Sequence, residues 1–182
     1  MSQPDVFHFS EGPPQFSRPY LDETTYGQAL DTLVIACVDV VLVWGDRILL
    51  GERRHPPRPG WWVIGGRMVH GESPMEAVQR KLKEEAGLEA IGSDRLRFIG
   101  TFSTRFAERG QPPRDRGLHS INLTYCVELR GEEARAITLD SNEYGRSKWW
   151  TWDEIYSALN PTLEMDRALT QILTHIQRPV QS

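Results

Sequence analysis

The chain has 182 residues, 39% of them hydrophobic, which suits one globular domain with a sizeable core. With 25 acidic and 21 basic residues its formal net charge is -4, so bulk electrostatics do not recruit nucleic acid or an anionic membrane surface. The longest apolar run, residues 33–43, is too short to span a bilayer, and the N-terminus lacks the basic-then-apolar pattern of a signal peptide. A cytoplasmic protein is therefore expected.

Residues 1–20 are predicted to form an extended arm, because prolines interrupt them repeatedly and their apolar residues show little periodicity. Such an arm would pack on the surface or on a partner chain, and in this way it hints at a homodimer. Residues 21–182 are expected to form a single domain. Its first element is a short helix over residues 21–30 that begins at Asp22.

A core strand is expected from Thr32 to Trp44, where β-branched residues predominate. A turn at Gly45 and Asp46 then leads to a second strand over residues 47–50. Asp39 interrupts the apolar run, and an unpaired buried charge is costly. Its carboxylate is therefore expected either to accept hydrogen bonds from a neighbouring backbone or arginine, or to face a functional cavity.

A helix follows a short strand at residues 61–64. Ser73 provides a hydroxyl N-cap, Pro74 suits the first helical position, and Glu76 can close a capping box. Gly87 is suited to end the helix, because a left-handed residue after the last turn is easiest for glycine.

The same helix places Lys81, Glu84 and Glu85 on one face. Two carboxylates and a backbone carbonyl would suit Mg²⁺, which prefers oxygen ligands and leaves room for substrate phosphates. Alternatively, the charges form a solvated face with ion pairs between Glu76 and Arg80, or between Lys81 and Glu85.

A strand over residues 96–103 comes next, followed by a long polar loop that ends at Gly117. The arginines of this loop either form a solvated surface or line an entrance for phosphates. They are Arg105, Arg109, Arg114 and Arg116. Strict alternation of apolar and polar residues then predicts a strand over residues 119–129.

The last third of the chain is predicted to close the fold. Residues 131–140 are expected to form a connection that ends in a short strand, and residues 141–145 a turn. A strand at residues 148–151 precedes two helices, at residues 153–159 and 161–176. This order predicts an α/β fold, a mixed β-sheet between helices in an α/β/α sandwich.

A single motif carries a family resemblance. Its members, in order and at the spacing of this chain, are Gly66, Glu72, Arg80, Leu82, Glu84, Glu85, Gly87 and Leu88. The pattern resembles the Nudix box, and the resemblance implies a Nudix-type α/β/α sandwich. It also implies hydrolysis of a nucleoside diphosphate linked to another moiety, with Mg²⁺ or Mn²⁺ as cofactor.

The resemblance assigns roles within the box. Glu84 and Glu85 would be metal ligands, with the carbonyl of Gly65 as another. Glu72 and Arg80 would form an ion pair that fixes the loop on the helix behind the metal. The charge of Glu85 is expected to face solvent and metal rather than the core, so Glu85→Gln should abolish turnover with little loss of stability.

Lys81 departs from the usual box, which has glutamate there, and this implies fewer metal ions. The flanking residues 49–53 and 61–67 resemble the branch that includes GDP-mannose mannosyl hydrolase. Members of that branch also lack this glutamate, and they break the C–O bond at the sugar. By this resemblance Arg53 and Arg67 would be catalytic and bind the diphosphate leaving group.

The same resemblance implies that Asp39 lies near the sugar and that a late loop supplies a catalytic histidine and a metal ligand. Here Glu143 falls on the ligand and Tyr144 on the histidine, and tyrosine is a poor base at neutral pH. We therefore expect Glu143 to complete the metal shell or to orient water. His119 is a further candidate for contact with the substrate, although a histidine at the start of a strand is more often structural.

The sequence thus predicts a Mg²⁺-dependent Nudix hydrolase of a nucleoside diphosphate sugar resembling GDP-mannose, releasing nucleoside diphosphate and sugar by C–O cleavage. One alternative is a pyrophosphohydrolase that cleaves P–O in a nucleoside diphosphate derivative. Another is a module that binds a nucleotide sugar without turning it over.

Overall fold

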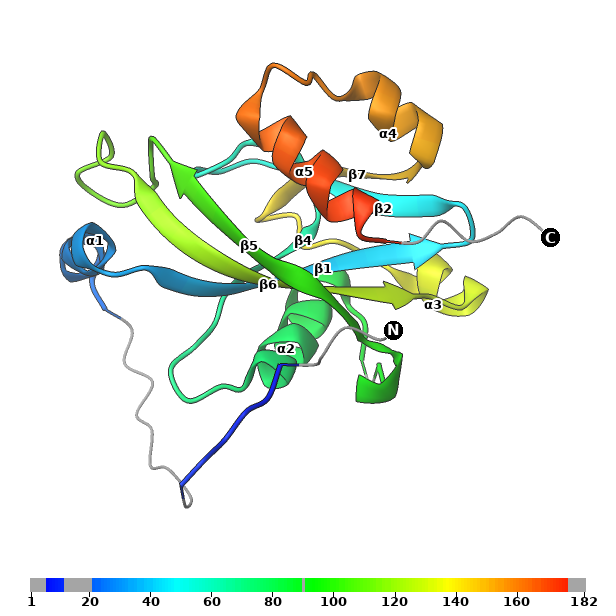
Figure 1. Cartoon of the computed structure of the whole chain (residues 1–182), viewed down its shortest axis with the longest axis horizontal. Coiled ribbons are helices and arrows are strands. Elements are labelled where there is room, and N and C mark those ends of the chain that lie inside the picture. The colour runs from blue at the N-terminus through cyan, green and yellow to red at the C-terminus, as the bar shows by residue number, and fades with distance from the viewer. Residues whose placement is uncertain (1–5, 12–20, 90, 177–182) are drawn as a thin grey trace.

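The computed structural model describes residues 6–11, 21–89 and 91–176, and its centre is a mixed β-sheet (Figure 1). Strand β1 (Ile35–Trp44) lies in the middle of this sheet. It pairs antiparallel with β2 (Arg47–Arg53) and β4 (Ile64–Arg67), and parallel with β6 (Leu118–Glu128). Every residue of β1 therefore pairs with at least one neighbouring strand, and such a central position suits a β-branched and apolar sequence.

The outer strands complete the sheet, which has seven strands within the described residues. The third strand, β3 (Gly60–Trp62), and the last, β7 (Tyr144–Thr151), both pair antiparallel with β2. On the other side β5 (Arg97–Phe106) pairs antiparallel with β6. The expected mixed sheet is confirmed.

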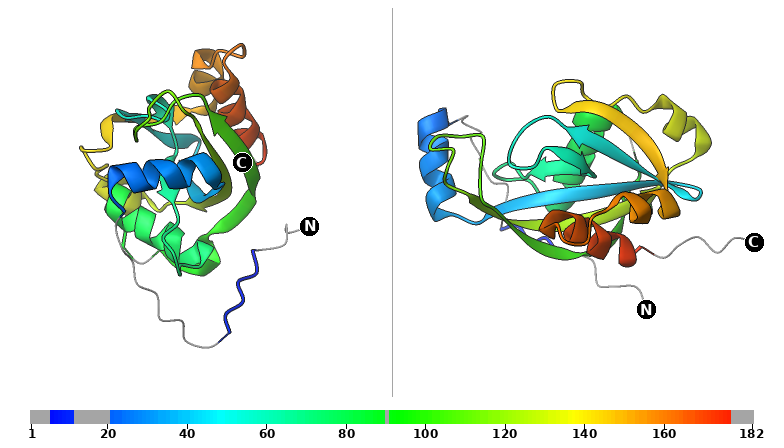
Figure 2. Two further views of the ribbon diagram at one scale, coloured as in Figure 1. Left: turned by 90° about the vertical axis from the view of Figure 1, so that its left-hand side faces the viewer. Right: turned by 90° about the horizontal axis from the view of Figure 1, so that it is seen from above.

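Helices cover both faces of the sheet. The long helix α2 (Pro74–Ala86) packs on one face, and α4 (Trp152–Ala158) with α5 (Glu164–Thr174) covers the other (Figure 1). Helix α1 (Glu23–Thr32) lies across one end, beside the loop that joins β5 to β6 (Figure 2). Two short elements, η1 (Ser93–Arg95) and α3 (Gly131–Ala136), lie in the connections.

Strand β1 separates two apolar clusters, because alternate residues point to opposite faces. Val38, Val40 and Leu42 face the cluster that contains the apolar stripe of α2. Val41 and Val43 face the cluster under α4 and α5. The α/β/α sandwich expected from the order of elements is confirmed.

The ends of α2 agree with the expected signals. Ser73 Oγ accepts a hydrogen bond from the backbone N–H of Glu76, and the Glu76 carboxylate accepts one from the N–H of Ser73. Gly87 follows the last turn in the left-handed conformation, with φ of 66°. The capping box and the glycine cap therefore fix this helix at both ends.

The connection between β6 and β7 differs from the prediction. Residues 131–136 form α3, and residues 137–143 form no strand in the described structure. The backbone N–H groups of Thr138 and Asp140 donate to the carbonyls of Ala86 and Glu85, at 3.4 and 3.0 Å. The expected short strand is absent because the end of α2 takes the hydrogen bonds that a sheet neighbour would need.

The predicted strand at residues 61–64 and the predicted N-terminal arm also differ from what the structure describes. The strand expected at residues 61–64 divides after Trp62, because β3 pairs with β2 whereas β4 pairs with β1. The arm expected at residues 1–20 falls mostly outside the described residues, so the arm and the homodimer it hints at stay predictions. Among the described residues, no helix has the length and apolar character needed to cross a bilayer.

Candidate active site

A bidentate ion pair holds the loop before α2 against the helix. Arg80 donates from Nε and Nη2 to the two carboxylate oxygens of Glu72, at 2.6 and 2.9 Å. The same Nη2 donates to the carbonyl of Arg67, and Glu72 also accepts from the N–H of Val69. Glu72 is buried, so this network fixes the path of the chain from β4 into α2.

Glu85 is buried, and both of its carboxylate oxygens have hydrogen-bond or ion-pair partners. Its Oε1 lies 2.8 Å from the Nζ of Lys81, one helical turn earlier. Its Oε2 accepts from the hydroxyl of Tyr144 at 2.5 Å and from the N–H of Gly65 at 3.2 Å. Only 5% of the residue is exposed. The expectation that its charge faces solvent and metal is therefore wrong, because Tyr144 and β4 cover it.

Tyr144 reaches Glu85 from the first position of β7 and is itself buried. Burial and the charge of Glu85 raise the pKa of the Tyr144 hydroxyl well above its usual range. The phenol therefore stays protonated and acts as a hydrogen-bond donor. No local sequence signal predicts this contact, because the two residues are 59 positions apart.

Glu84 is the more open of the two acids. Its side chain is 51% exposed and pairs with Arg80 at 2.9 Å, while Lys81 lies 3.8 Å away. Of the two ion pairs considered for a solvated helix face, the one between Lys81 and Glu85 forms. The other does not, because Glu76 serves the capping box and Arg80 binds Glu72 and Glu84.

The glycine pair of β4 lets the backbone approach this group closely. Gly65 has φ of 150°, and a Cβ at this position would lie 2.3 Å from the carbonyl oxygen of Val38. A Cβ on Gly66 would lie 3.3 Å from Nζ of Lys81. The ammonium of Lys81 therefore lies between the Gly66 backbone and the Glu85 carboxylate.

This arrangement does not fit a divalent metal ion. The expected ligands were Glu84, Glu85, Glu143 and the carbonyl of Gly65. Both oxygens of Glu85 are taken by donors, and Glu143 is exposed in the turn before β7. Within the described residues, no group of three or more His, Cys, Asp and Glu side chains is placed to hold a metal ion.

A cavity of about 210 Å³ opens beside this cluster. Asp39, Arg53 and Arg67 line it together, and Tyr26 of α1 contributes to its wall. These three charged residues come from β1, β2 and β4, so strand pairing brings them together. The structure thus assembles three of the predicted substrate-binding residues around one space.

Asp39 is the buried acid of this cavity. Asn122 donates from Nδ2 to Asp39 Oδ2 at 2.7 Å. Burial raises the pKa of Asp39 from 3.8 to about 6, against the opposing effects of the Asn122 hydrogen bond and the Arg53 charge. Asp39 therefore faces a cavity, and its hydrogen-bond donor is the Asn122 side chain instead of the expected backbone or arginine.

The two arginines differ in how they are held. The guanidinium of Arg67 lies 4.3 Å from the ring centroid of Tyr26, a cation–π contact that ties β4 to α1. Arg53 is half-buried at the end of β2 and makes no ion pair within the described residues. Its charge therefore remains available to an anionic ligand.

His119 does not join the cavity. Its Nε2 lies 2.9 Å from the hydroxyl of Ser103 on the neighbouring strand. Along β6 it alternates with Ser120 and Asn122, which line the cavity, so its ring points to the other face of the sheet. The expected contact between His119 and the substrate is therefore not supported by its position.

The four arginines considered for this loop divide: Arg105, Arg114 and Arg116 are exposed, as a solvated surface requires, whereas Arg109 is buried. Arg109 is only 1% exposed; it donates to Asp31 at 2.7 Å and to the carbonyls of Gln111, Pro112 and Gly117. Exposed Arg116 binds the second oxygen of Asp31 at 2.6 Å. Arg109 thus anchors α1, which roofs the cavity, and neither lines a phosphate entrance nor faces solvent.

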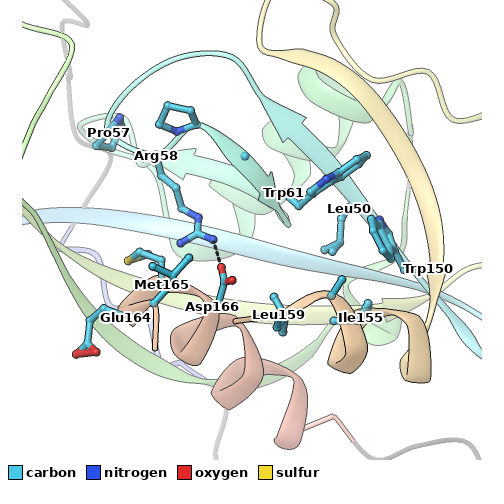
Figure 3. Close-up of a pocket in the computed structure, with 14 residues that line it drawn as sticks. Leu50, Pro57, Arg58, Trp61, Trp150, Ile155, Leu159, Glu164, Met165 and Asp166 are labelled. Carbon is cyan, nitrogen blue, oxygen red and sulfur yellow. Dashed lines mark hydrogen bonds and ion pairs between the residues drawn. The ribbon is translucent and has the colours of Figure 1, made fainter. Parts of the chain in front are cut away.

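A second cavity, of about 520 Å³, lies on the α4 and α5 side of the sheet (Figure 3). Trp61 and Trp150 form an edge-to-face pair in its wall, with ring centroids 5.2 Å apart. Arg58 reaches across to Asp166 of α5, at 3.0 Å. Arg58 also lines the smaller cavity, so the loop that carries it separates the two spaces.

A comparison with models of known protein families agrees with the fold and with the motif from Gly66 to Leu88. Residues 35–171 match the model of the NUDIX domain. The chain belongs to the Nudix family. The match starts with β1 and ends within α5, so the Nudix domain comprises the whole sheet and the acidic helix, whereas α1 precedes it.

Solved structures show the same fold. A MutT NUDIX hydrolase from Burkholderia pseudomallei is similar with a TM-score of 0.60 and 20% identity, over 80% of this chain and 99% of that one. A MutT/nudix family protein from Enterococcus faecalis is similar with a TM-score of 0.52 and 19% identity, over 73% of this chain. This Nudix chain spans only 57% of the length of that relative.

A bifunctional NMN adenylyltransferase/ADP ribose pyrophosphatase from Francisella tularensis is a third relative in fold. It has a TM-score of 0.58 and 18% identity, over 84% of this chain and 44% of that one. All three likenesses show a mixed sheet flanked by helices. The identity of the Nudix substrate has to come from the site itself.

Proposed function

We propose that this Nudix protein hydrolyses a nucleoside diphosphate sugar, of the GDP-mannose type, to nucleoside diphosphate and free sugar. The observation that carries the proposal is the shared cavity of Asp39, Arg53 and Arg67 beside the Nudix helix. Two guanidinium groups suit a diphosphate, since they offer paired donors to phosphate oxygens. A buried carboxylate beside them suits an acid–base role at the sugar.

In the proposed reaction water attacks the anomeric carbon and the C–O bond to the diphosphate breaks. Arg53 and Arg67 bind the diphosphate and stabilise the negative charge that it gains on leaving. Asp39 accepts the proton of the attacking water. With a pKa of about 6, its carboxylate is mostly ionised at neutral pH and still basic enough to take a proton.

The proposal gives Asp39 this role instead of Glu143. Asp39 lines the cavity, whereas Glu143 is exposed in the turn before β7. Nudix hydrolases generally use Mg²⁺ or Mn²⁺. Here both oxygens of Glu85 already contact donors, so the acidic residues of the helix fit such an ion poorly. No step of the proposed route therefore passes through a metal.

Product analysis tests the proposal. The protein is incubated with a panel of nucleotide sugars in heavy-oxygen water, and the products are identified by mass spectrometry. C–O cleavage yields nucleoside diphosphate and a free sugar that carries the label. Asp39→Asn should remove this activity, while His119→Gln, on the other face of the sheet, should retain it. Turnover that survives in Asp39→Asn would refute the assigned base.

Cleavage at phosphorus is the second candidate. The Francisella tularensis relative is described as an ADP ribose pyrophosphatase, and its shared fold favours a test of this reaction. Here the products are a nucleoside monophosphate and a sugar phosphate, and the label enters a phosphate. Either pair of products identifies the bond that is broken.

Ligand binding without turnover is the third candidate, favoured by the engagement of Glu85 with Lys81 and Tyr144. In that case a nucleotide sugar raises the melting temperature although no product forms, with or without added Mg²⁺. Detectable free sugar or sugar phosphate excludes it.

A further inference from the structure

The carboxylate of Glu85 already has a cation. Lys81 Nζ lies 2.8 Å from Oε1, and the side chain of this lysine is only 17% exposed. The distance to Glu84 Oε2 is 3.8 Å, so the ammonium lies near both acids of the helix face. The position between two carboxylates is the one that a bound metal ion would be expected to take.

The other oxygen of Glu85 is turned toward hydrogen-bond donors. The hydroxyl of Tyr144 and the N–H of Gly65 both direct hydrogens at Oε2. A divalent ion there would have to displace these donors and also approach the ammonium of Lys81. Mg²⁺ needs oxygen ligands at about 2.0–2.1 Å, and a carboxylate whose two oxygens both contact donors does not offer one.

We propose that the ammonium of Lys81 takes the place of a divalent metal ion on Glu85 and forms the wall of the ligand's diphosphate site together with Arg53 and Arg67. Tyr144 then orients Glu85 toward the lysine. The first half of this inference concerns the cation site alone. The second half rests on the proposed function, because it names a diphosphate as the ligand.

The position of Lys81 supports the second half. Gly66 lines the cavity, and Nζ of Lys81 would lie 3.3 Å from a Cβ at Gly66. A side chain at Gly66 would press against the end of the lysine, so the glycine favours this close approach of the ammonium to the cavity wall. Arg53 and Arg67 line the cavity beside its acid Asp39, and the ammonium of Lys81 lies next to Gly66 of the same wall. An ammonium can bind phosphate oxygens as a compact charge.

Metal binding tests the first half. Mn²⁺ is titrated into the full chain and its free concentration is followed by electron paramagnetic resonance. We expect no tight site in the wild type, and a new one in Lys81→Glu, which restores the usual residue of the box. Lys83→Glu is the matched control: Lys83 is exposed on the same helix, pairs with Glu89 and should gain no Mn²⁺ site.

Two results overturn the cation assignment. One is micromolar Mn²⁺ binding to the wild type that Glu85→Gln abolishes. The other is a Lys81→Glu chain that folds, as judged by circular dichroism, and still binds no Mn²⁺. Because Lys81→Glu could lose stability, Lys81→Gln is measured as well. Removal of the ammonium alone should then give measurable Mn²⁺ binding to Glu84 and Glu85.

Ligand binding tests the second half. Adenosine and guanosine diphosphates are titrated in excess EDTA by calorimetry. We expect the wild type to bind, Lys81→Gln to bind about tenfold or more weakly, and Lys83→Gln to be unchanged. Equal affinity of Lys81→Gln and wild type would overturn the role of Lys81 at the diphosphate. If the wild type binds neither compound, the proposed function fails, while the Mn²⁺ comparison still decides the cation site.

Discussion

The hydroxyl of Tyr144 lies 2.5 Å from Glu85 Oε2, so the first residue of β7 holds the buried acid of the Nudix helix. Space for the tyrosine ring comes from Gly51, where a Cβ would lie 2.3 Å from Tyr144 Cδ1. This contact joins β2, β7 and α2 at one point. It also means that the acid is positioned by a distant strand as well as by its own helix.

Tyr144→Phe should therefore destabilise the fold without changing its core volume much. The variant leaves Oε2 of Glu85 with Gly65 as its donor, and a hydrogen bond to a buried charged group contributes about 1.5–3 kcal/mol. Urea unfolding followed by circular dichroism measures the change. A loss below about 0.5 kcal/mol would show that the hydroxyl contributes nothing to Glu85.

Glu85→Gln should also lower stability, in contrast to the expectation from the sequence. The amide keeps an acceptor oxygen but leaves the mostly buried ammonium of Lys81 with only the more distant carboxylate of Glu84, at a cost of about 1–3 kcal/mol. Glu84→Gln is the control, because Glu84 is half-exposed and its ion pair should contribute no more than about 1 kcal/mol. A double-mutant cycle with Tyr144→Phe should give strongly non-additive losses.

The pKa of Asp39 predicts a pH-dependent loss of stability. Because burial raises this pKa from 3.8 to about 6, the folded protein retains a proton that the unfolded chain releases. The contribution of Asp39 to stability therefore falls as the pH rises from about 4 to about 6, by about 3 kcal/mol in all. The difference in unfolding free energy between wild type and Asp39→Asn, measured across this range, isolates it. A constant difference would refute the raised pKa.

Arg109 and Arg116 bind the same carboxylate but should contribute unequally. Arg109 is buried, so Arg109→Ala removes one of the two donors of Asp31, leaves several carbonyls without a donor and should destabilise by about 3–5 kcal/mol. Arg116 is 63% exposed, and Arg116→Ala should change stability by no more than about 1 kcal/mol. Thermal unfolding and amide hydrogen exchange in α1 report both effects. Equal losses would contradict the anchoring role of Arg109.

Gly65→Ala should disturb the junction of β1 and β4. Its φ of 150° and the 2.3 Å approach to the Val38 carbonyl leave no room for a methyl group. Gly45→Ala is the matched control: φ is 59°, but a Cβ there would meet nothing within 4 Å. The control should lose about 1–2 kcal/mol from its left-handed backbone, and Gly65→Ala clearly more. Chemical denaturation of the two variants makes the comparison.

Local signals predicted much of the fold. The capping residues Ser73 and Glu76 and the glycine cap Gly87 define α2 in the sequence and in the structure. Asp22 likewise caps α1 as expected, accepting from the N–H groups of Thr24 and Thr25. These predictions succeed because each depends on hydrogen bonds between residues that are near in sequence.

Long-range contacts account for what the sequence left open. The pairing of Tyr144 with Glu85 and the burial of Arg109 depend on which elements meet across the sheet, and no periodicity records this. The short strand expected before residue 140 is absent from the described structure, because the backbone of residues 138 and 140 bonds to the end of α2. Spacing thus identified the box, whereas tertiary contacts decide how its charges are used.

The roof of the cavity has a consequence for how ligand choice can change. Tyr26 and Leu30 belong to α1, which lies outside the residues that match the Nudix domain, and Gly27 allows this helix to approach the Pro112 carbonyl closely. The helix that carries the Nudix box therefore lies inside the domain match, whereas the helix that covers the cavity lies outside it. Evolution or design can exchange the N-terminal helix to admit a different ligand while every residue of the box stays as it is.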